Sequence, residues 1–193
     1  MTAKNIAAAK DIYQLKVTLL GSKPPIWRRI LVPADLTLAK LHGVLQTVMG
    51  WYDEHMHEFR ASQNRFGRPG IRGSGMRMSG VESEATTTLS AVLRKTGAKM
   101  TYTYDFGDSW EHGIVLEKQL AIDPHTTYPL CTDGQLACPP EDCGGIHGYY
   151  ALLHARTNPK HPRHEELCDW IGDRFNPEAF SVDKVNRLLS PAP

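Results

Sequence analysis

The segment from Met100 to Glu117 constrains the fold most, because apolar and polar side chains alternate on both sides of a short turn. Residues 100–106 and 110–117 carry the alternation, and Gly107-Asp108 separates them. Two alternating runs around a short polar turn predict a β-hairpin, with Gly107 supplying a positive φ. Side chains leave a strand on alternate faces, so we expect Glu111 and His112 on opposite sides and the aromatic side chains in a core.

The residues before this hairpin predict further strands and a helix. Alternation over residues 12–20 and a short β-rich run over 26–32 predict two antiparallel strands around a Gly/Pro turn. Thr37 is a predicted N-cap, and apolar residues at helical spacing then continue to Gly50. A strand over about 55–60 and a short helix over about 89–96 follow.

The residues after the hairpin contain fewer strand signals. Prolines and glycines punctuate residues 121–148, which predicts a long irregular loop. Helical patterns then cover residues 147–155, about 162–171, and 182–189. A strand-rich first half and a helical C-terminal half predict an α+β fold. We expect a single domain over residues 1–193, with residues 1–11 as a disordered head.

Composition and charge exclude some classes of protein. Lys and Arg total 22 and Asp and Glu total 21, so the charge balance gives no general affinity for nucleic acid. No apolar run approaches the ~20 residues that a membrane span requires, and no secretion signal is recognisable. Three of the four cysteines lie within thirteen residues, a cluster that in a chain without a signal peptide favours reduced thiols or a metal site over disulfides. The sequence therefore predicts a cytoplasmic protein without a membrane partner.

Five segments in order resemble the plasmid pRiA4b ORF-3-like family, whose members are also labelled transposon-passenger or resolvase-like proteins. The segments are WRRILVP, TLAKLHGVLQTVMGWYDEHMHEF, YTYDFGDSWEH, CPPEDCGGIHGY and HEELCDWIGDRFNPEAFSVDKVN. The resemblance covers about Tyr13 to Leu189. It implies an α+β fold with a mixed or antiparallel sheet packed against helices, and an association with plasmids and mobile elements.

The resemblance leaves the biochemical role open. Serine recombinase chemistry is not expected, because the first serine, Ser22, lies in a Gly-Ser-Lys-Pro-Pro turn and not in a nucleophile position. We expect an accessory or binding protein more than an enzyme. The alternatives are a metal-dependent hydrolase with a His/Asp site and a scaffold whose Pro/Gly-rich loop contacts a protein partner.

A first candidate metal site uses histidines and acids. His55 and His57 share one strand face, His112 approaches from the hairpin, and Asp108 or a neighbouring acid, Asp105 or Glu111, completes the set. Two imidazoles and a carboxylate suit Zn²⁺, Mn²⁺ or Fe²⁺ with open positions for water. The alternative is that these histidines only donate hydrogen bonds within a core or face solvent.

A second candidate is a structural zinc site on Cys131, Cys138 and Cys143, with Cys168 or a histidine as the fourth ligand, which would hold the Pro/Gly-rich loop. Thiolates suit zinc, but the intervening spacings are six and four residues. The alternative is that the cysteines are small buried apolar residues. Within the same loop, Glu141-Asp142 follows two prolines, and Asp142 is expected chiefly to cap a turn.

Nucleic-acid contact is predicted from an Arg/Gly-rich loop over residues 62–80 and from aromatic residues of the hairpin. Arginines track phosphates and aromatic rings stack on bases. The candidates are Arg65, Arg68 and Arg72, with Arg60, Arg77, Arg28 and Arg29 nearby in the sequence. DNA or RNA is the candidate partner. The alternative is that the Arg/Gly-rich loop is only solvated and the aromatic residues form the core face of the hairpin, which the near-zero net charge favours. If a catalytic or metal site exists, we expect it where the hairpin meets residues 55–57 and the loop over 138–145.

Overall fold

The computed structural model describes residues 11–68, 80–172 and 175–190. Within these residues the chain forms one eight-stranded sheet and five helices, so the predicted α+β class is confirmed. Residues 1–10 of the predicted head and Arg72 lie outside the described residues, and Asp11 begins the first strand.

The sheet is mixed. Its strands are β1 (Asp11–Leu19), β2 (Trp27–Pro33), β3 (His57–Ala61), β4 (Asn64–Gly67), β5 (Val81–Ser83), β6 (Lys99–Tyr104), β7 (Trp110–Ala121) and β8 (Leu130–Gln135). They lie in the order β5-β4-β3-β6-β7-β1-β2-β8. The β4–β5 pair is parallel and the other neighbours are antiparallel.

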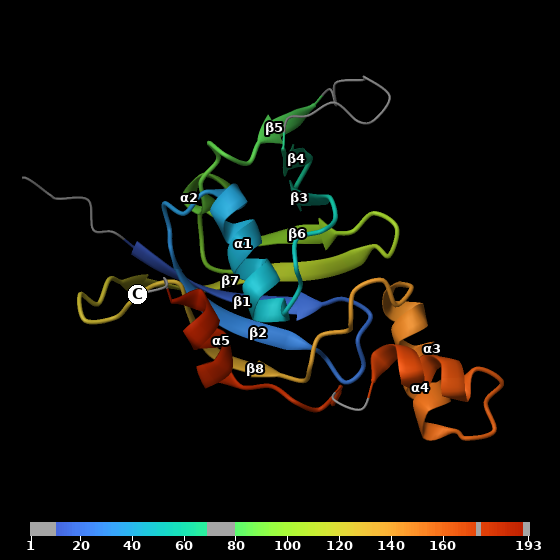
Figure 1. Ribbon diagram of the computed structural model, residues 1–193. Helices are drawn as coiled ribbons and strands as arrows, with labels where there is room; N and C mark the ends of the chain where they lie inside the picture. The colour runs from blue at the N-terminus through green and yellow to red at the C-terminus, as the bar shows by residue number, and fades with distance from the viewer. Residues whose placement is uncertain (1–10, 69–79, 173–174, 191–193) are drawn as a thin grey trace, which may run out of the picture.

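The helices cover one face and one end of this sheet. They are α1 (Leu38–Met49), α2 (Leu89–Val92), α3 (Gly145–Thr157), α4 (His164–Ile171) and α5 (Val182–Leu189). Figure 1 shows α1 and α5 across the same face of the sheet, with α3 and α4 beside one end. Within the described residues, no helix has the length and apolar character needed to cross a membrane.

Helix α1 forms where its local signals predict it. The Thr37 side chain accepts a hydrogen bond from the Lys40 amide, and Gly50 ends the helix at a φ of 87°. Its buried face includes Leu38, Leu41 and Leu45, which contribute to the main hydrophobic cluster. Each fully buried leucine contributes about 1.5–3 kcal/mol to folding.

The hairpin is confirmed as β6 and β7, and its alternation fixes which face is buried. Tyr102 and Tyr104 are fully buried, whereas Thr101 and Thr103 on the other face are half-buried. His112 is buried and Glu111 is exposed, as the alternation predicts. An antiparallel sheet with one covered face and one polar face accounts for this pattern.

Two details of the expected organisation differ from the structure. The second half is not helical throughout, because β7 and β8 lie between residues 110 and 135. Strand β8 was missed because Asp133-Gly134 interrupt its alternation, and it forms through pairing with β2. The expected positive φ at Gly107 is wrong. Asp105 and Ser109 adopt it instead, at 55° and 51°, and the Asp105 side chain accepts the Gly107 amide at 2.8 Å.

Strand β8 lies at one edge of the sheet and is covered by α5. The side-chain oxygen of Asn186 accepts the Cys131 amide at 2.8 Å, and its Nδ2 donates to the Cys131 carbonyl at 2.9 Å. The side-chain amide thereby makes the two bonds that a neighbouring strand would make. Helix α5 is tied to the sheet edge in this way.

Candidate functional site

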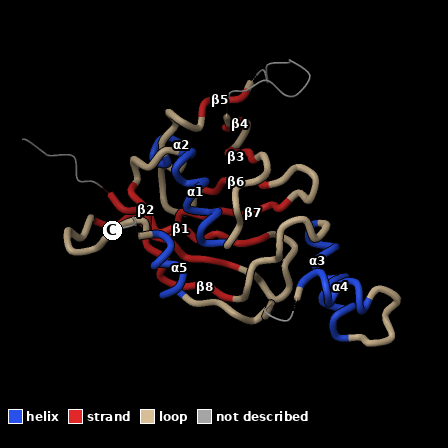
Figure 2. The backbone as a smooth tube through the Cα atoms, in the orientation of Figure 1, coloured by secondary structure: helices blue, strands red, loops and turns tan. Residues whose placement is uncertain are grey.

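Three chain segments meet at the end of the sheet next to α3. They are residues 51–56 after α1, the β6–β7 turn over 105–109, and the loop over 139–144; we call them the site segments. Figure 2 shows the β6–β7 turn and the loop that enters α3 at the same end of the sheet. Each segment belongs to one of the motifs that carry the family resemblance.

Hydrogen bonds between the segments hold them together. The Trp51 indole donates to the Pro139 carbonyl at 3.0 Å, and the Gly144 amide donates to the Asp108 carboxylate at 3.0 Å. The next residue, Gly145, lies against the backbone of Asp108. A Cβ added to Gly145 would be 2.4 Å from the Asp108 carbonyl oxygen, so only glycine fits there. The role of Asp108 is therefore to hold the loop over residues 139–144.

The phenol of Tyr104 links two of the segments. Its hydroxyl donates to the Glu141 carboxylate and accepts the Glu54 amide at 3.0 Å. Burial and then the Glu141 carboxylate raise the pKa of Tyr104 well above its usual value, so the hydroxyl keeps its proton at neutral pH. The Tyr52 amide also donates to Glu141, at 3.2 Å, so Tyr52 and Tyr104 both hold the Glu141 carboxylate.

His55, Asp105 and Asp142 form the first cluster of potential metal ligands, with one ligand atom of each within 4.8 Å of the others. Nε2 of His55 lies 3.1 Å from Oδ1 of Asp142 and 3.9 Å from Oδ2 of Asp105. The Nε2 atom is buried but forms no hydrogen bond with the described residues. The Asp142 oxygen is close enough for a hydrogen bond, so the absence of one means that this oxygen lies away from the direction of the Nε2–H bond or lone pair.

The two carboxylates reach His55 from different segments and from an uncommon backbone conformation. Asp105 and Asp142 have φ values of 55° and 59°, which for residues other than glycine are uncommon and occur most readily in Asp and Asn. Because Oδ1 of Asp105 accepts the Gly107 amide, Oδ2 remains turned toward His55. Asp142 is exposed, so this cluster opens to solvent.

A pocket of about 230 Å³ lies beside His55. Its walls include Met56, His57, Phe106 and Arg68. The Arg68 side chain is largely exposed at the pocket and lies 3.4 Å from Asp53 and 3.6 Å from Glu84. A small molecule in this pocket would therefore contact imidazole, carboxylate and guanidinium groups.

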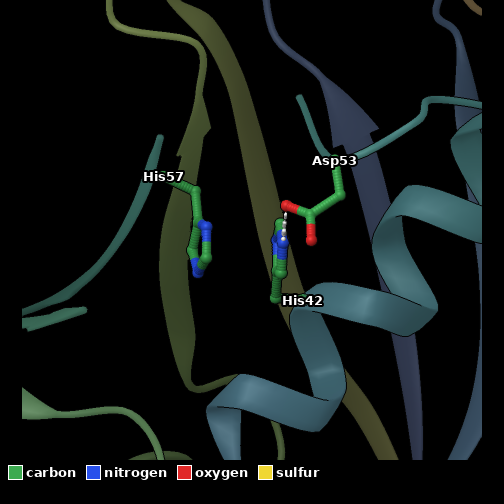
Figure 3. Close-up of side chains that lie close together, drawn as sticks. All are labelled: His42, Asp53 and His57. Atoms are coloured by element: carbon green, nitrogen blue, oxygen red, sulfur yellow. Dashed lines mark hydrogen bonds and ion pairs between the residues drawn. The ribbon is translucent and has the colours of Figure 1, made fainter. Parts of the chain in front are cut away.

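His42, Asp53 and His57 form a second cluster, in which two imidazole rings stack (Figure 3). The ring centroids lie 3.5 Å apart at an interplanar angle of 10°. His42 comes from α1 and His57 is the first residue of β3, while Asp53 belongs to the segment that connects these two elements. Nε2 of His42 lies 2.6 Å from Asp53, and Nε2 of His57 lies 2.7 Å from the buried Glu84 carboxylate.

The second cluster is a buried hydrogen-bond network and a poor metal centre. A metal ion lies in the plane of each imidazole that binds it, and two parallel rings 3.5 Å apart cannot both point at one ion. The remaining nitrogen of His42 bonds the Tyr102 hydroxyl at 2.7 Å. Burial, reinforced by His57, lowers the pKa of His42 and favours a neutral ring.

The described residues do not gather His55, His57, His112 and Asp108 into one centre. His55 joins Asp105 and Asp142, and His57 stacks on His42. His112 is completely buried beneath Trp51, with Nδ1 3.3 Å from the Tyr102 carbonyl. Burial lowers the pKa of His112 to about 4, so it is neutral at physiological pH.

The cysteines stay apart as well. Within the described residues, none of the groups of three potential metal ligands contains a cysteine. Cys131 contacts the Asp133 carbonyl, Cys138 contacts the Met49 sulfur, and Cys143 contacts the Gly145 carbonyl. Burial raises the pKa of Cys138 and of Cys143 to about 12, which favours thiols over the thiolates that zinc binds. The cysteine arrangement thus favours the alternative of small buried residues.

The predicted nucleic-acid contacts are arginines that already have acidic partners. Arg60 and Arg65 both bond the buried Glu58 carboxylate. Arg68 lies between Asp53 and Glu84. Arg72 lies outside the described residues. These pairs reduce the positive charge that the described arginines present to a phosphate backbone.

The site contains residues that the sequence patterns did not single out as a cluster. His42 occupies a position on the apolar face of α1, next to Leu38, Leu41 and Leu45, and a polar residue at a core position is a usable signal. Asp53 has no comparable signal. Asp142 was expected to cap a turn, and its contact with His55 joins residues too distant in sequence for spacing to predict.

A mixed sheet with helices on one face and a His/Asp cluster at one end defines an α+β protein with a candidate ligand site. The chain belongs to the family of plasmid pRiA4b ORF-3-like proteins, whose family model matches residues 11–184. The fold and the sequence comparison therefore agree with the resemblance of the five motifs.

Two relatives share most of the chain. The "Uncharacterized protein y4hQ" of Sinorhizobium fredii is 38% identical over 182 residues, covering 93% of this chain and 91% of the relative. The crystal structure of "Protein of Unknown Function MM3350" from Methanosarcina mazei superposes with a TM-score of 0.81 at 35% identity. That match covers 91% of this chain and 96% of the other. Both relatives are described as uncharacterised or of unknown function.

Proposed function

We propose that this protein is a metal-dependent hydrolase whose metal ion is bound by His55, Asp105 and Asp142. One observation carries the proposal. A buried imidazole nitrogen, without a hydrogen-bond partner among the described residues, faces two carboxylates at 3.1 Å and 3.9 Å. An unpaired buried nitrogen is costly unless another group occupies the space in front of it.

The separations suit a shared cation. Ligand atoms about 2.0–2.2 Å from a Zn²⁺ ion lie about 2.8–3.6 Å from one another in octahedral or tetrahedral geometry. The measured 3.1 Å fits this range and the 3.9 Å needs a small movement of Asp105. One nitrogen and two carboxylate oxygens suit Zn²⁺, Mn²⁺ or Fe²⁺.

Three protein ligands leave coordination positions for water, and a bound metal ion lowers the pKa of such a water toward 7. The substrate would enter the pocket beside His55, where Phe106 provides an apolar wall.

Metal content tests the first half of the proposal. Protein purified without a metal-affinity tag and incubated with Zn²⁺, Mn²⁺ or Fe²⁺ is expected to retain about one ion per chain by elemental analysis. Asp142→Asn should lose that ion without unfolding, because Asp142 is exposed. Asp35→Asn is the matched control, since Asp35 is an exposed aspartate away from the site. Absence of stoichiometric metal in the unaltered protein would refute the site.

Activity tests the second half. Hydrolysis of nitrophenyl esters and phosphate esters by the metal-loaded protein should stop on chelation, return on adding the metal, and fail to return in Asp142→Asn. Stoichiometric metal without any hydrolysis would leave a metal-binding protein and overturn the hydrolase. Salt-dependent binding of DNA or RNA in a gel mobility shift, equal in the unaltered protein and in Asp142→Asn, would instead support the accessory role.

A further inference from the structure

Arg28 is a buried cation for which the described residues supply no acidic partner. By alternation along β2 it lies on the covered face with Ile30 and Val32, and it is only 2% exposed. Its Nε donates to the Val48 carbonyl at 2.9 Å. Its Nη1 donates to the Trp27 and Gln135 carbonyls at 2.8 Å and 2.9 Å. Within the described residues, Arg28 forms no ion pair with a carboxylate.

These bonds explain part of the role of Arg28 and leave part unexplained. The Val48 carbonyl belongs to the last turn of α1, where the helix dipole favours a cation. Three of the five N–H groups of the guanidinium have acceptors, whereas the two on Nη2 have none among the described residues. The nearby thiols of Cys131 and Cys138 supply no charge at neutral pH, because burial raises the pKa of both.

Arg28 lies at the wall of the largest of the described pockets. This groove has a volume of about 930 Å³ and lies between the end of α1 and the segment that includes α5. Its apolar lining includes Met49, Trp51, Phe175, Phe180 and Leu188. The Phe180 ring packs on the guanidinium, with its centroid 4.0 Å from the central carbon. The other charged residues of the lining are Lys184 and Glu178. The volume is within the range of small-molecule sites.

We infer that this groove binds a small organic anion, a monocarboxylate with an apolar body, whose carboxylate bonds the Nη2 side of Arg28. The two N–H groups of Nη2 are the remaining donors of the guanidinium, and a carboxylate accepts charge-assisted hydrogen bonds from such donors. The apolar lining suits an aliphatic or aromatic body. The charged groups of the lining, Arg28, Lys184 and Glu178, sum to one positive charge, which a single carboxylate balances. This site uses different residues from the cluster at His55, and its ligand is independent of the proposed hydrolase.

Matched ligands test the role of charge. Octanoate, octanol and octyl phosphate share one apolar chain and differ in the head group. We expect saturable binding of octanoate by calorimetry and at least about tenfold weaker binding of octanol, a difference of about 1.4 kcal/mol. If octanol bound as tightly as octanoate, the groove would be a non-specific apolar surface. If octyl phosphate bound more tightly than octanoate, the ligand class would be a phosphate and not a carboxylate. Either result overturns the inference.

Matched variants locate the binding. Leu188→Glu adds a negative charge at an exposed position of the lining, 63% accessible, and should weaken octanoate binding at least about tenfold with an unchanged fold by circular dichroism. Ile122→Glu makes the same change at an exposed residue outside the lining and should bind octanoate normally. Arg28→Met, if folded, should lose the preference for octanoate over octanol. Equal octanoate affinity in Leu188→Glu and the unaltered protein would place binding elsewhere.

Discussion

At the scale of single residues, buried histidines are the most informative groups in this protein. His112 donates one hydrogen bond, to the Tyr102 carbonyl, and its other ring nitrogen has no partner among the described residues. Desolvation disfavours the charged ring and lowers the pKa of His112 from 6.5 to about 4. This residue should therefore make folding sensitive to acid.

The pH dependence has a defined direction. Between pH 6.5 and about 4 the unfolded chain binds a proton at His112 that the folded chain does not bind, so the free energy of unfolding falls as the pH falls. Between pH 7 and pH 5, the free energy of unfolding measured with urea should fall by about 2 kcal/mol less in His112→Phe than in the unaltered protein. The comparison with the unaltered protein cancels other titrating groups. Parallel pH curves would contradict a neutral buried His112.

At the scale of elements, the join between the loop over 139–144 and α3 depends on close backbone contact. An added Cβ at Gly148 would lie 1.9 Å from the Cys143 carbonyl oxygen, so any larger residue displaces the segment that carries Asp142. Gly43 in α1 offers the matched case, because nothing lies within 4 Å of its added Cβ.

The two glycines should respond to alanine in opposite directions. Gly148→Ala should lower the free energy of unfolding by about 1–3 kcal/mol, because the loop must move. Gly43→Ala should raise it by about 0.5–1 kcal/mol, because alanine favours the helix. Urea denaturation of both variants measures the difference. If Gly148→Ala were as stable as the unaltered protein, the loop would move without a cost in free energy, which would contradict this prediction.

At the scale of the whole molecule, the buried cluster includes residues from β1 to α5. Because elements from both ends of the described chain share it, the predicted single domain should unfold in one cooperative transition. Val185→Ala removes buried atoms of α5 and should lower the midpoint of that one transition in scanning calorimetry. Asp183→Ala, an exposed change in the same helix, should leave the midpoint unchanged. A separate early transition in Val185→Ala would mean that α5 unfolds independently.

The elements that were predictable from the sequence are those with local signals. Helix α1 has a cap, an apolar stripe and a terminal glycine, and the β6–β7 hairpin has regular alternation. Strand β8 lacks such signals, since its residues become a strand through pairing with β2. The helical C-terminal half was an overestimate for the same reason.

The sequence predicts where the candidate site lies better than it predicts which residues form it. The motifs containing His55, Asp105 and Asp142 are recognisable in sequence, and the structure brings those segments together. Strand alternation gives the face of each histidine but not its partner. His57 consequently pairs with Glu84 and stacks on His42 instead of joining His55. Contacts of this kind depend on how α1 and the loops pack on the sheet.

The bond pair between Asn186 and Cys131 has a consequence for self-association. An exposed sheet edge is a template for strand addition by another chain. Here the β8 edge is occupied by a side-chain amide that imitates a strand, and the opposite edge is β5, only three residues long. Among the residues that the structure describes, neither edge offers a long template, so growth of the sheet into a continuous intermolecular ribbon is disfavoured. We therefore expect any assembly of this protein to use side-chain surfaces more than strand pairing along these two edges.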